Sequence, residues 1–164
     1  MPMAPRPRSH TVRSGSTERQ VRILALQFLY TRDVRGREGD DISQTLDWLC
    51  AEEPATGAAV RQKAEAVATG ILDDVARLDE VIQQYAPVLP VNLLAIVDRN
   101  ILRVAIYELT AIDRAPSRVI INEATDLASK FGSESSARFV NGVLGSVLNG
   151  LSDTPKAALV QGGY

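Results

Sequence analysis

The chain begins with side chains suited to binding phosphate. Five arginines occur within the first 22 residues, against a single acid. These arginines are Arg6, Arg8, Arg13, Arg19 and Arg22. An arginine guanidinium donates two parallel hydrogen bonds to one phosphate or carboxylate. Arg19 and Arg22 are three residues apart, so a helix would carry both on one face. The cluster indicates an anionic ligand, with a solvated tail that only aids solubility as the alternative.

The remainder of the chain has the opposite charge. Five basic residues and one acid give the first 22 residues a net charge of +4, whereas thirteen basic and nineteen acidic residues give positions 23–164 a net charge of −6. Two aromatic side chains, Tyr30 and Phe139, are candidate stacking platforms, because single-stranded RNA is read largely through unpaired bases stacked on aromatics and arginine. A core position is the alternative for both.

Residue types that bind metals or form disulfides are sparse. His10 is the only histidine and Cys50 the only cysteine, so no intramolecular disulfide is possible and no metal-ligand spacing occurs. Neither a glycine-rich phosphate loop nor a nucleophile elbow is present. We therefore expect no metal and no cofactor.

Paired acids are the remaining candidates for catalysis. Asp73-Asp74 and Asp79-Glu80 fall on the polar side of a striped helix, where a solvated face is far more common than a catalytic dyad. Asn122 and Glu123 interrupt an apolar helix, and such residues more often cap or bridge neighbouring helices than form a site. The sequence does not predict an enzyme.

The length of 164 residues fits one domain with tails. The first 22 residues lack the apolar segment of a signal peptide, and no apolar run approaches the ~20 residues of a membrane span. We expect a soluble, cytoplasmic protein without a membrane partner. We predict three parts: a disordered Arg-rich arm at residues 1–16, the folded domain at 17–150 and a flexible tail at 151–164.

Apolar side chains recur at helical spacing through the folded part. The stripes cover residues 17–35, 42–52, 60–85, 93–109, 117–131 and 135–148. The stretch 93–109 is apolar on most of its circumference, as expected of the central helix of a bundle. The sequence predicts an all-α, compact bundle of about seven helices.

Local signals refine the helix ends. Ser16 or Thr17 is expected to cap the first helix. Gly132 is expected to end the helix containing Phe131 in a left-handed conformation. Gly142 lies inside a helix, where glycine costs roughly 1 kcal/mol against alanine. We expect it to permit a close helix approach, with Asn141 hydrogen-bonded across the gap.

Three segments resemble the signature of the NusB family, bacterial transcription antitermination factors. They are ALQFLY at the end of the first helix, VDRNILRVAIYEL, and VIINEATDLASKFG followed by RFVNGVL. The resemblance covers about residues 19–150. It implies an all-helical fold of two halves. It also implies binding of the boxA element of nascent ribosomal RNA leaders together with the small ribosomal protein NusE. The resemblance further implies that the two proteins together join RNA polymerase and other Nus factors and suppress premature termination of ribosomal RNA operons.

The resemblance also implies roles for particular residues. RNA contacts fall on Arg13, Arg19, Arg22, Tyr30, Arg138 and Phe139. Contacts with the protein partner fall on Asp98, Arg99, Arg103 and Ser135, the last standing where many members have aspartate. We expect replacement of Arg19 and Arg22 by alanine to weaken RNA binding and leave folding intact. The alternative is a self-associating protein–protein scaffold, such as a homodimer, without autonomous RNA binding.

Overall fold

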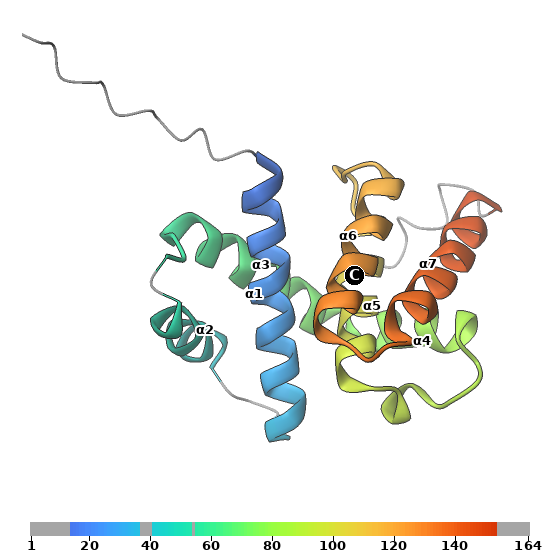
Figure 1. Cartoon of the computed structure of the whole chain (residues 1–164), viewed down its shortest axis with the longest axis horizontal. Coiled ribbons are helices and arrows are strands. Elements are labelled where there is room, and N and C mark those ends of the chain that lie inside the picture. The colour runs from blue at the N-terminus through green and yellow to red at the C-terminus, as the bar shows by residue number, and fades with distance from the viewer. Residues whose placement is uncertain (1–13, 37–40, 54, 154–164) are drawn as a thin grey trace, which may run out of the picture.

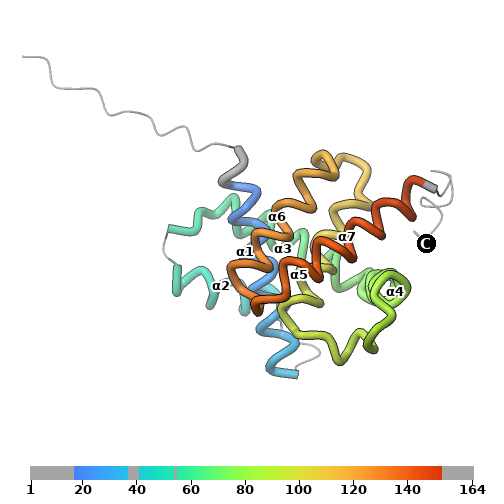
Figure 2. Tube along the Cα trace, turned by 45° about the vertical axis from the view of Figure 1, so that its right-hand side comes forward, coloured from blue at the N-terminus to red at the C-terminus, as the bar shows by residue number. Residues whose placement is uncertain are grey.

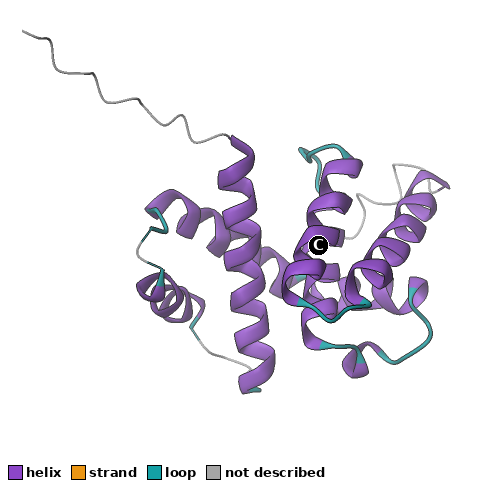
Figure 3. Cartoon of the chain, in the orientation of Figure 1, coloured by secondary structure: helices purple, strands orange, loops and turns teal. Residues whose placement is uncertain are grey.

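The computed structural model describes residues 14–36, 41–53 and 55–153, and every regular element within these ranges is a helix (Figure 3). The helices are α1 (Ser14–Arg35), α2 (Ile42–Glu52), α3 (Ala58–Asp73), α4 (Val75–Tyr85), the short 3-10 turn η1 (Val91–Leu93), α5 (Ile96–Leu109), α6 (Ser117–Phe131) and α7 (Ser136–Asp153). The prediction of an all-α bundle of about seven helices is confirmed. None of these helices is both long and apolar enough to cross a membrane.

The helices form two halves that meet along α1 and α5. Helix α1 lies between α2 on one side and α4 on the other in both views of the chain (Figures 1 and 2), and α7 lies on the α4 side in Figure 1. Helix α5 packs against α1, α4, α6 and α7. Its buried side chains include Ile101, Leu102 and Ile106. The all-round apolar stretch is therefore the central helix, as predicted.

Helix α1 differs from the prediction at its start and agrees with it at its end. It begins at Ser14, so Ser16 and Thr17 lie within it instead of capping it. It ends at Arg35, and Gly36 follows with a φ of +63°, while its N–H donates to the Arg32 carbonyl at 3.1 Å. Only glycine adopts such a left-handed conformation without strain. The turn after α1 thus depends on this glycine.

The long stripe over residues 60–85 forms two helices, not one. The break lies at Asp74, whose φ of −118° and ψ of 13° are not helical. The Arg77 guanidinium donates to the Asp74 carboxylate at 2.8 Å across this bend. Helix α3 packs against α1, whereas α4 packs against α5 and α7. The sequence pattern does not reveal this break, because the apolar spacing continues through it.

Gly132 ends α6 as predicted, but its predicted left-handed conformation is wrong, and so is the close helix approach predicted at Gly142. Gly132 has φ −92° and ψ −168°, an extended conformation. A side chain there would lie 2.5 Å from the Cβ of Ser136 and 2.7 Å from the Ala128 carbonyl oxygen, so close approach and not handedness requires glycine. A side chain at Gly142 would meet nothing within 4 Å. Gly142 and Asn141 both face outward, and no hydrogen bond crosses to another described helix from Asn141.

Candidate functional site

The two arginines of α1 that were predicted to bind phosphate form ion pairs with carboxylates of the same chain. Arg19 donates from Nε and Nη2 to both carboxylate oxygens of Glu123 at 2.9 Å, and from Nη2 to Asp126 Oδ2 at 3.2 Å. Its side chain is 48% exposed. The hydrogen bonds from Arg19 hold the pKa of Glu123 below its usual value despite partial burial. Glu123 therefore bridges α6 to α1, which is the bridging role considered for it from the sequence.

Arg22 is more deeply enclosed than Arg19. Its Nε and Nη2 donate to the two carboxylate oxygens of Glu108 on α5 at 2.7 and 3.0 Å. Burial alone would lower the pKa of Arg22, but the hydrogen bonds and charge of Glu108 outweigh it and raise that pKa. Arg22 is thus positively charged, and its Nε and Nη2 are engaged by Glu108 inside the chain.

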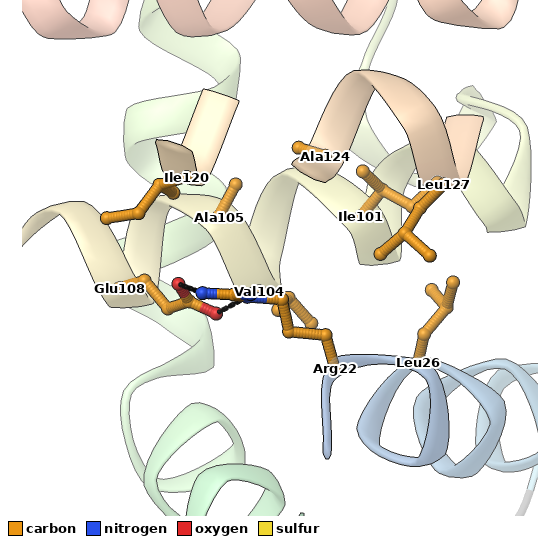
Figure 4. A pocket seen from close by; sticks show the side chains of 9 residues that line it. All are labelled: Arg22, Leu26, Ile101, Val104, Ala105, Glu108, Ile120, Ala124 and Leu127. Atoms are coloured by element: carbon orange, nitrogen blue, oxygen red, sulfur yellow. Dashed lines mark hydrogen bonds and ion pairs between the residues drawn. The ribbon is translucent and has the colours of Figure 1, made fainter. Parts of the chain in front are cut away.

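Beside this ion pair lies an apolar contact between α1, α5 and α6 (Figure 4). Figure 4 shows the Arg22 and Glu108 side chains meeting over Val104, with Leu26 and Leu127 facing each other beside them. The void they leave is about 10 Å³, which is at the limit for a single water molecule. The contact seals the joint between the halves and offers no room for a ligand.

Two residues expected to face the protein partner also bond within the chain. Arg103 donates from Nε and Nη2 to both oxygens of Asp79 at 2.8 Å, and from Nη1 to Asp33 Oδ2 at 3.2 Å. Arg99 donates from Nη2 to the same Asp33 oxygen at 2.8 Å, and Asn100 Nδ2 does so at 3.0 Å. Burial would raise the pKa of Asp33, but these donors and the two positive charges lower it. The network ties α1 to α4 and α5.

The other expected partner residues are placed differently. Asp98 is buried in the first turn of α5, and its Oδ1 has no hydrogen-bond partner among the described residues. Ser135 is exposed just before α7, and its carbonyl accepts from the Phe139 N–H at 3.1 Å. Its hydroxyl contacts the Ser133 hydroxyl at 3.3 Å. Of the four partner residues, Ser135 alone is exposed.

The remaining residues that were predicted to bind RNA differ in their exposure. Arg13 lies outside the described residues. Tyr30 is exposed on α1, and Arg138 is exposed on α7. Phe139 is half-buried and packs against the core, which fits the core alternative weighed for it. Of the predicted RNA-binding residues that are described, only Tyr30 and Arg138 therefore combine exposure with freedom from internal ion pairs.

The structure adds two aromatic residues that the sequence interpretation missed. Trp48 on α2 and Phe131 at the end of α6 are exposed and line one groove with Tyr30. Phe131 ends the apolar stripe over residues 117–131, yet its side chain is 38% exposed. For Trp48 a signal was available, because it falls beside the inward-facing spacing of Leu46 and Leu49. An aromatic off the apolar stripe of a helix has no core to enter.

Several cations are also left without an ion pair to another described residue. They are Arg32, Arg35, Arg114, Arg118, Lys130 and Arg138. Arg35 lies over the Trp48 ring, 5.1 Å from its centroid, and Lys130 lies at the same distance from the Phe131 centroid. No group of three or more acids, histidines or cysteines within the described ranges could hold a metal ion. Two of these unpaired cations, Arg35 and Lys130, therefore lie against exposed aromatic rings.

These features define an all-helical binding domain of two halves joined by ion pairs. Residues 19–149 match the model of the NusB family, and the chain belongs to this family of transcription antitermination factors. It is 41% identical over 144 residues to transcription antitermination protein NusB of Dehalococcoides mccartyi, which covers 86% of this chain and 96% of that protein. Identity to NusB of Chloroflexus aggregans is 38% over 139 residues, covering 84% and 90% of the two chains.

Solved structures share the fold. NusB of T. maritima superposes with a TM-score of 0.72 at 30% identity, covering 80% of this chain and 89% of that one. The NusB chain in a complex of antitermination factors NusB and NusE with dsRNA gives a TM-score of 0.72 at 22% identity, covering 82% and 97%. At 22% identity, the comparison with this complex shows a shared fold and nothing more.

Proposed function

We propose that this chain binds the boxA element of ribosomal RNA leader transcripts together with ribosomal protein NusE. In this role it joins RNA polymerase and other Nus factors in the cytoplasm and suppresses premature termination of ribosomal RNA operons. The observation that carries the proposal is the family match over residues 19–149. A structure with the same fold, determined with NusE and dsRNA, supports both partners.

The chain acts in this proposal by binding and not by catalysis. Among the acids considered as catalytic pairs, the carboxylate of Asp79 is held by Arg103 and that of Asp74 by Arg77. Exposed aromatics and unpaired cations instead supply the two kinds of contact that single-stranded RNA requires.

The test is fluorescence anisotropy of a labelled boxA-type RNA, at two salt concentrations, with and without NusE. Binding that tightens with NusE and weakens with salt supports the proposal. Each phosphate contacted on a single strand contributes about −0.7 to the slope of log affinity against log salt. Absence of binding under every condition contradicts it.

A self-associating scaffold is the second candidate. It is favoured by the exposed side chains of Tyr30, Trp48 and Phe131, because clustered surface aromatics often mark protein interfaces. Light scattering that finds only monomer at micromolar concentration removes this candidate.

A further inference from the structure

The exposed aromatic side chains of the described residues gather around one groove. Tyr30 of α1 is 43% exposed, Trp48 of α2 is 50% exposed, and Phe131 at the end of α6 is 38% exposed. All three line a groove of about 350 Å³, together with apolar side chains from α1, α2 and α5. Its volume lies in the range of small-ligand sites, about 300–1,000 Å³. The three rings offer flat apolar faces to one occupant.

Two polar side chains of α1 also line the groove. Gln27 carries an amide and Thr31 a hydroxyl. Neither makes a hydrogen bond to another described residue. An amide and a hydroxyl supply both donors and acceptors, so they can pair with the edge of a planar heterocycle that stacks on the rings. An entirely apolar ligand would leave both groups unsatisfied.

Unpaired cations lie against two of the rings. The Arg35 guanidinium carbon is 5.1 Å from the centroid of the Trp48 ring, and Lys130 Nζ is 5.1 Å from that of Phe131. Neither cation has an ion pair with another described residue. A ligand that joins a flat apolar ring to negative charge matches both contacts at once. A nucleotide unit has this composition, whereas an apolar peptide segment would leave the cations unmatched.

A second groove continues the first along α1. The two share Gln27, Leu49 and Phe131, and the second, of about 300 Å³, extends past Lys130 to Gln20. A ligand longer than one ring system can therefore follow α1 across the ends of α2 and α6. This length suits a strand of several nucleotides.

We propose that this groove binds unpaired bases of single-stranded RNA. Trp48, Tyr30 and Phe131 stack on the bases, while Arg35 and Lys130 meet the flanking phosphates. The inference rests on the proposed function, since the RNA is the ligand of both. It assigns the base contacts to a surface between α1, α2 and α6, away from the internally paired Arg19 and Arg22.

Trp48 supplies its own probe, because it is the only tryptophan of the chain. A base stacked on an indole quenches its fluorescence. The full chain is titrated with a labelled boxA-type single-stranded RNA while anisotropy and Trp48 emission are recorded together. We expect emission to fall with the same midpoint as the anisotropy, and the same RNA annealed into a duplex to leave the emission unchanged.

Substitutions provide the second readout. We expect Trp48→Leu and Phe131→Leu each to weaken binding of the single-stranded RNA about tenfold, in the range for loss of one base stack. Both side chains are exposed, so circular dichroism should show an unchanged fold. Val88→Ala, at a position that is 86% exposed and lines neither groove, is the matched control and should bind as the wild type.

The outcomes separate this inference from the proposed function. RNA binding by anisotropy without a change in Trp48 emission, and with wild-type affinity in Trp48→Leu, overturns the groove assignment and leaves the proposed function standing. No RNA binding by any measure overturns both. Quenching by NusE alone, or by raising the protein concentration without RNA, shows a protein partner or a second copy in the groove and overturns its assignment to RNA.

Discussion

Arg22 on α1 and Glu108 on α5 form a two-bonded ion pair, with N···O distances of 2.7 and 3.0 Å, over the apolar joint between the two halves. The pair is largely enclosed, with side-chain exposures of 11% and 21%. The Nε–Nη2 face of this guanidinium is occupied by Glu108, so that face is not available to phosphate. Arg22 therefore links the two halves of the chain through Glu108, and a ligand would compete with Glu108 for it.

Removal of Arg22 should destabilise the fold. Arg22→Ala leaves the half-buried Glu108 carboxylate without its donors, and we expect the free energy of unfolding to fall by about 1–3 kcal/mol. Urea denaturation followed by circular dichroism measures this change. The expectation from the sequence, that replacing Arg19 and Arg22 leaves folding intact, is thereby revised. Glu108→Gln combined with Arg22→Ala should cost less than the sum of the single changes, and simple additivity would show that the pair contributes nothing.

Arg19 should respond differently, because its side chain is half exposed. Its donors are engaged by Glu123 and Asp126, so a phosphate must compete with two carboxylates for one guanidinium. Glu123→Gln removes the main competitor, and we expect affinity for boxA-type RNA to rise a few-fold while the salt slope steepens by about 0.7. Anisotropy titrations at several salt concentrations provide both values.

The control for that experiment is Glu80→Gln. Glu80 is exposed on α4 and has no ion pair with another described residue, so its substitution changes net charge by the same amount. An equal rise in affinity in Glu80→Gln would mean that overall charge, and not release of Arg19, causes the effect. In that case Arg19 would act only as a link between α1 and α6.

The fold was predictable because apolar spacing determines which face of each helix is buried. The stripes of α2 and α6 gave bounds that agree with the structure, and the all-round apolar α5 is central. The bend at Asp74 was not predictable, because the stripe passes through it without a change of phase. The positions of Gly70 and Gly150 beside Tyr107 and Tyr85 depend on tertiary contacts between distant helices, which spacing does not encode.

The candidate site was less predictable than the fold. Sequence identifies which residues are arginines but not which of them find carboxylates, and the partners of Arg19 and Arg22 lie 86 to 107 positions away. Trp48 and Phe131 lie 83 positions apart in the numbering and share a groove only because α1 brings α2 and α6 to its two sides. Such relationships arise from packing and not from local pattern.

The stability of the fold should depend on pH through the carboxylates of Asp33 and Glu123. Their pKa values are lowered in the folded chain by bound arginines, so the unfolded chain takes up protons at higher pH than the folded one. The stabilisation from these two carboxylates is therefore fully present above their ordinary pKa range. The free energy of unfolding should fall as pH drops below about 4.5 towards the lowered pKa values. Denaturation at a series of pH values measures this dependence.

Asp33→Asn should be less stable than the wild type at neutral pH and should lose less stability on acidification. Asp73→Asn, at an exposed position of α3 without an ion pair to a described residue, is the matched control. If Asp33→Asn retained the full acid dependence of the wild type, the network around Arg99 and Arg103 would not be its source.

Two mid-helix glycines should respond oppositely to alanine. At Gly142 a new Cβ meets nothing within 4 Å, so Gly142→Ala should raise the free energy of unfolding by about 0.5–1 kcal/mol through helix propensity alone. At Gly70 a new Cβ would lie 2.6 Å from Cζ of Tyr107 on α5. Gly70→Ala should therefore lower the free energy of unfolding by about 1–3 kcal/mol through overpacking. Urea denaturation of both variants makes the comparison. Stabilisation by both substitutions would mean that the Tyr107 ring moves aside at little cost, and that the contact of α3 with α5 is looser than the structure shows.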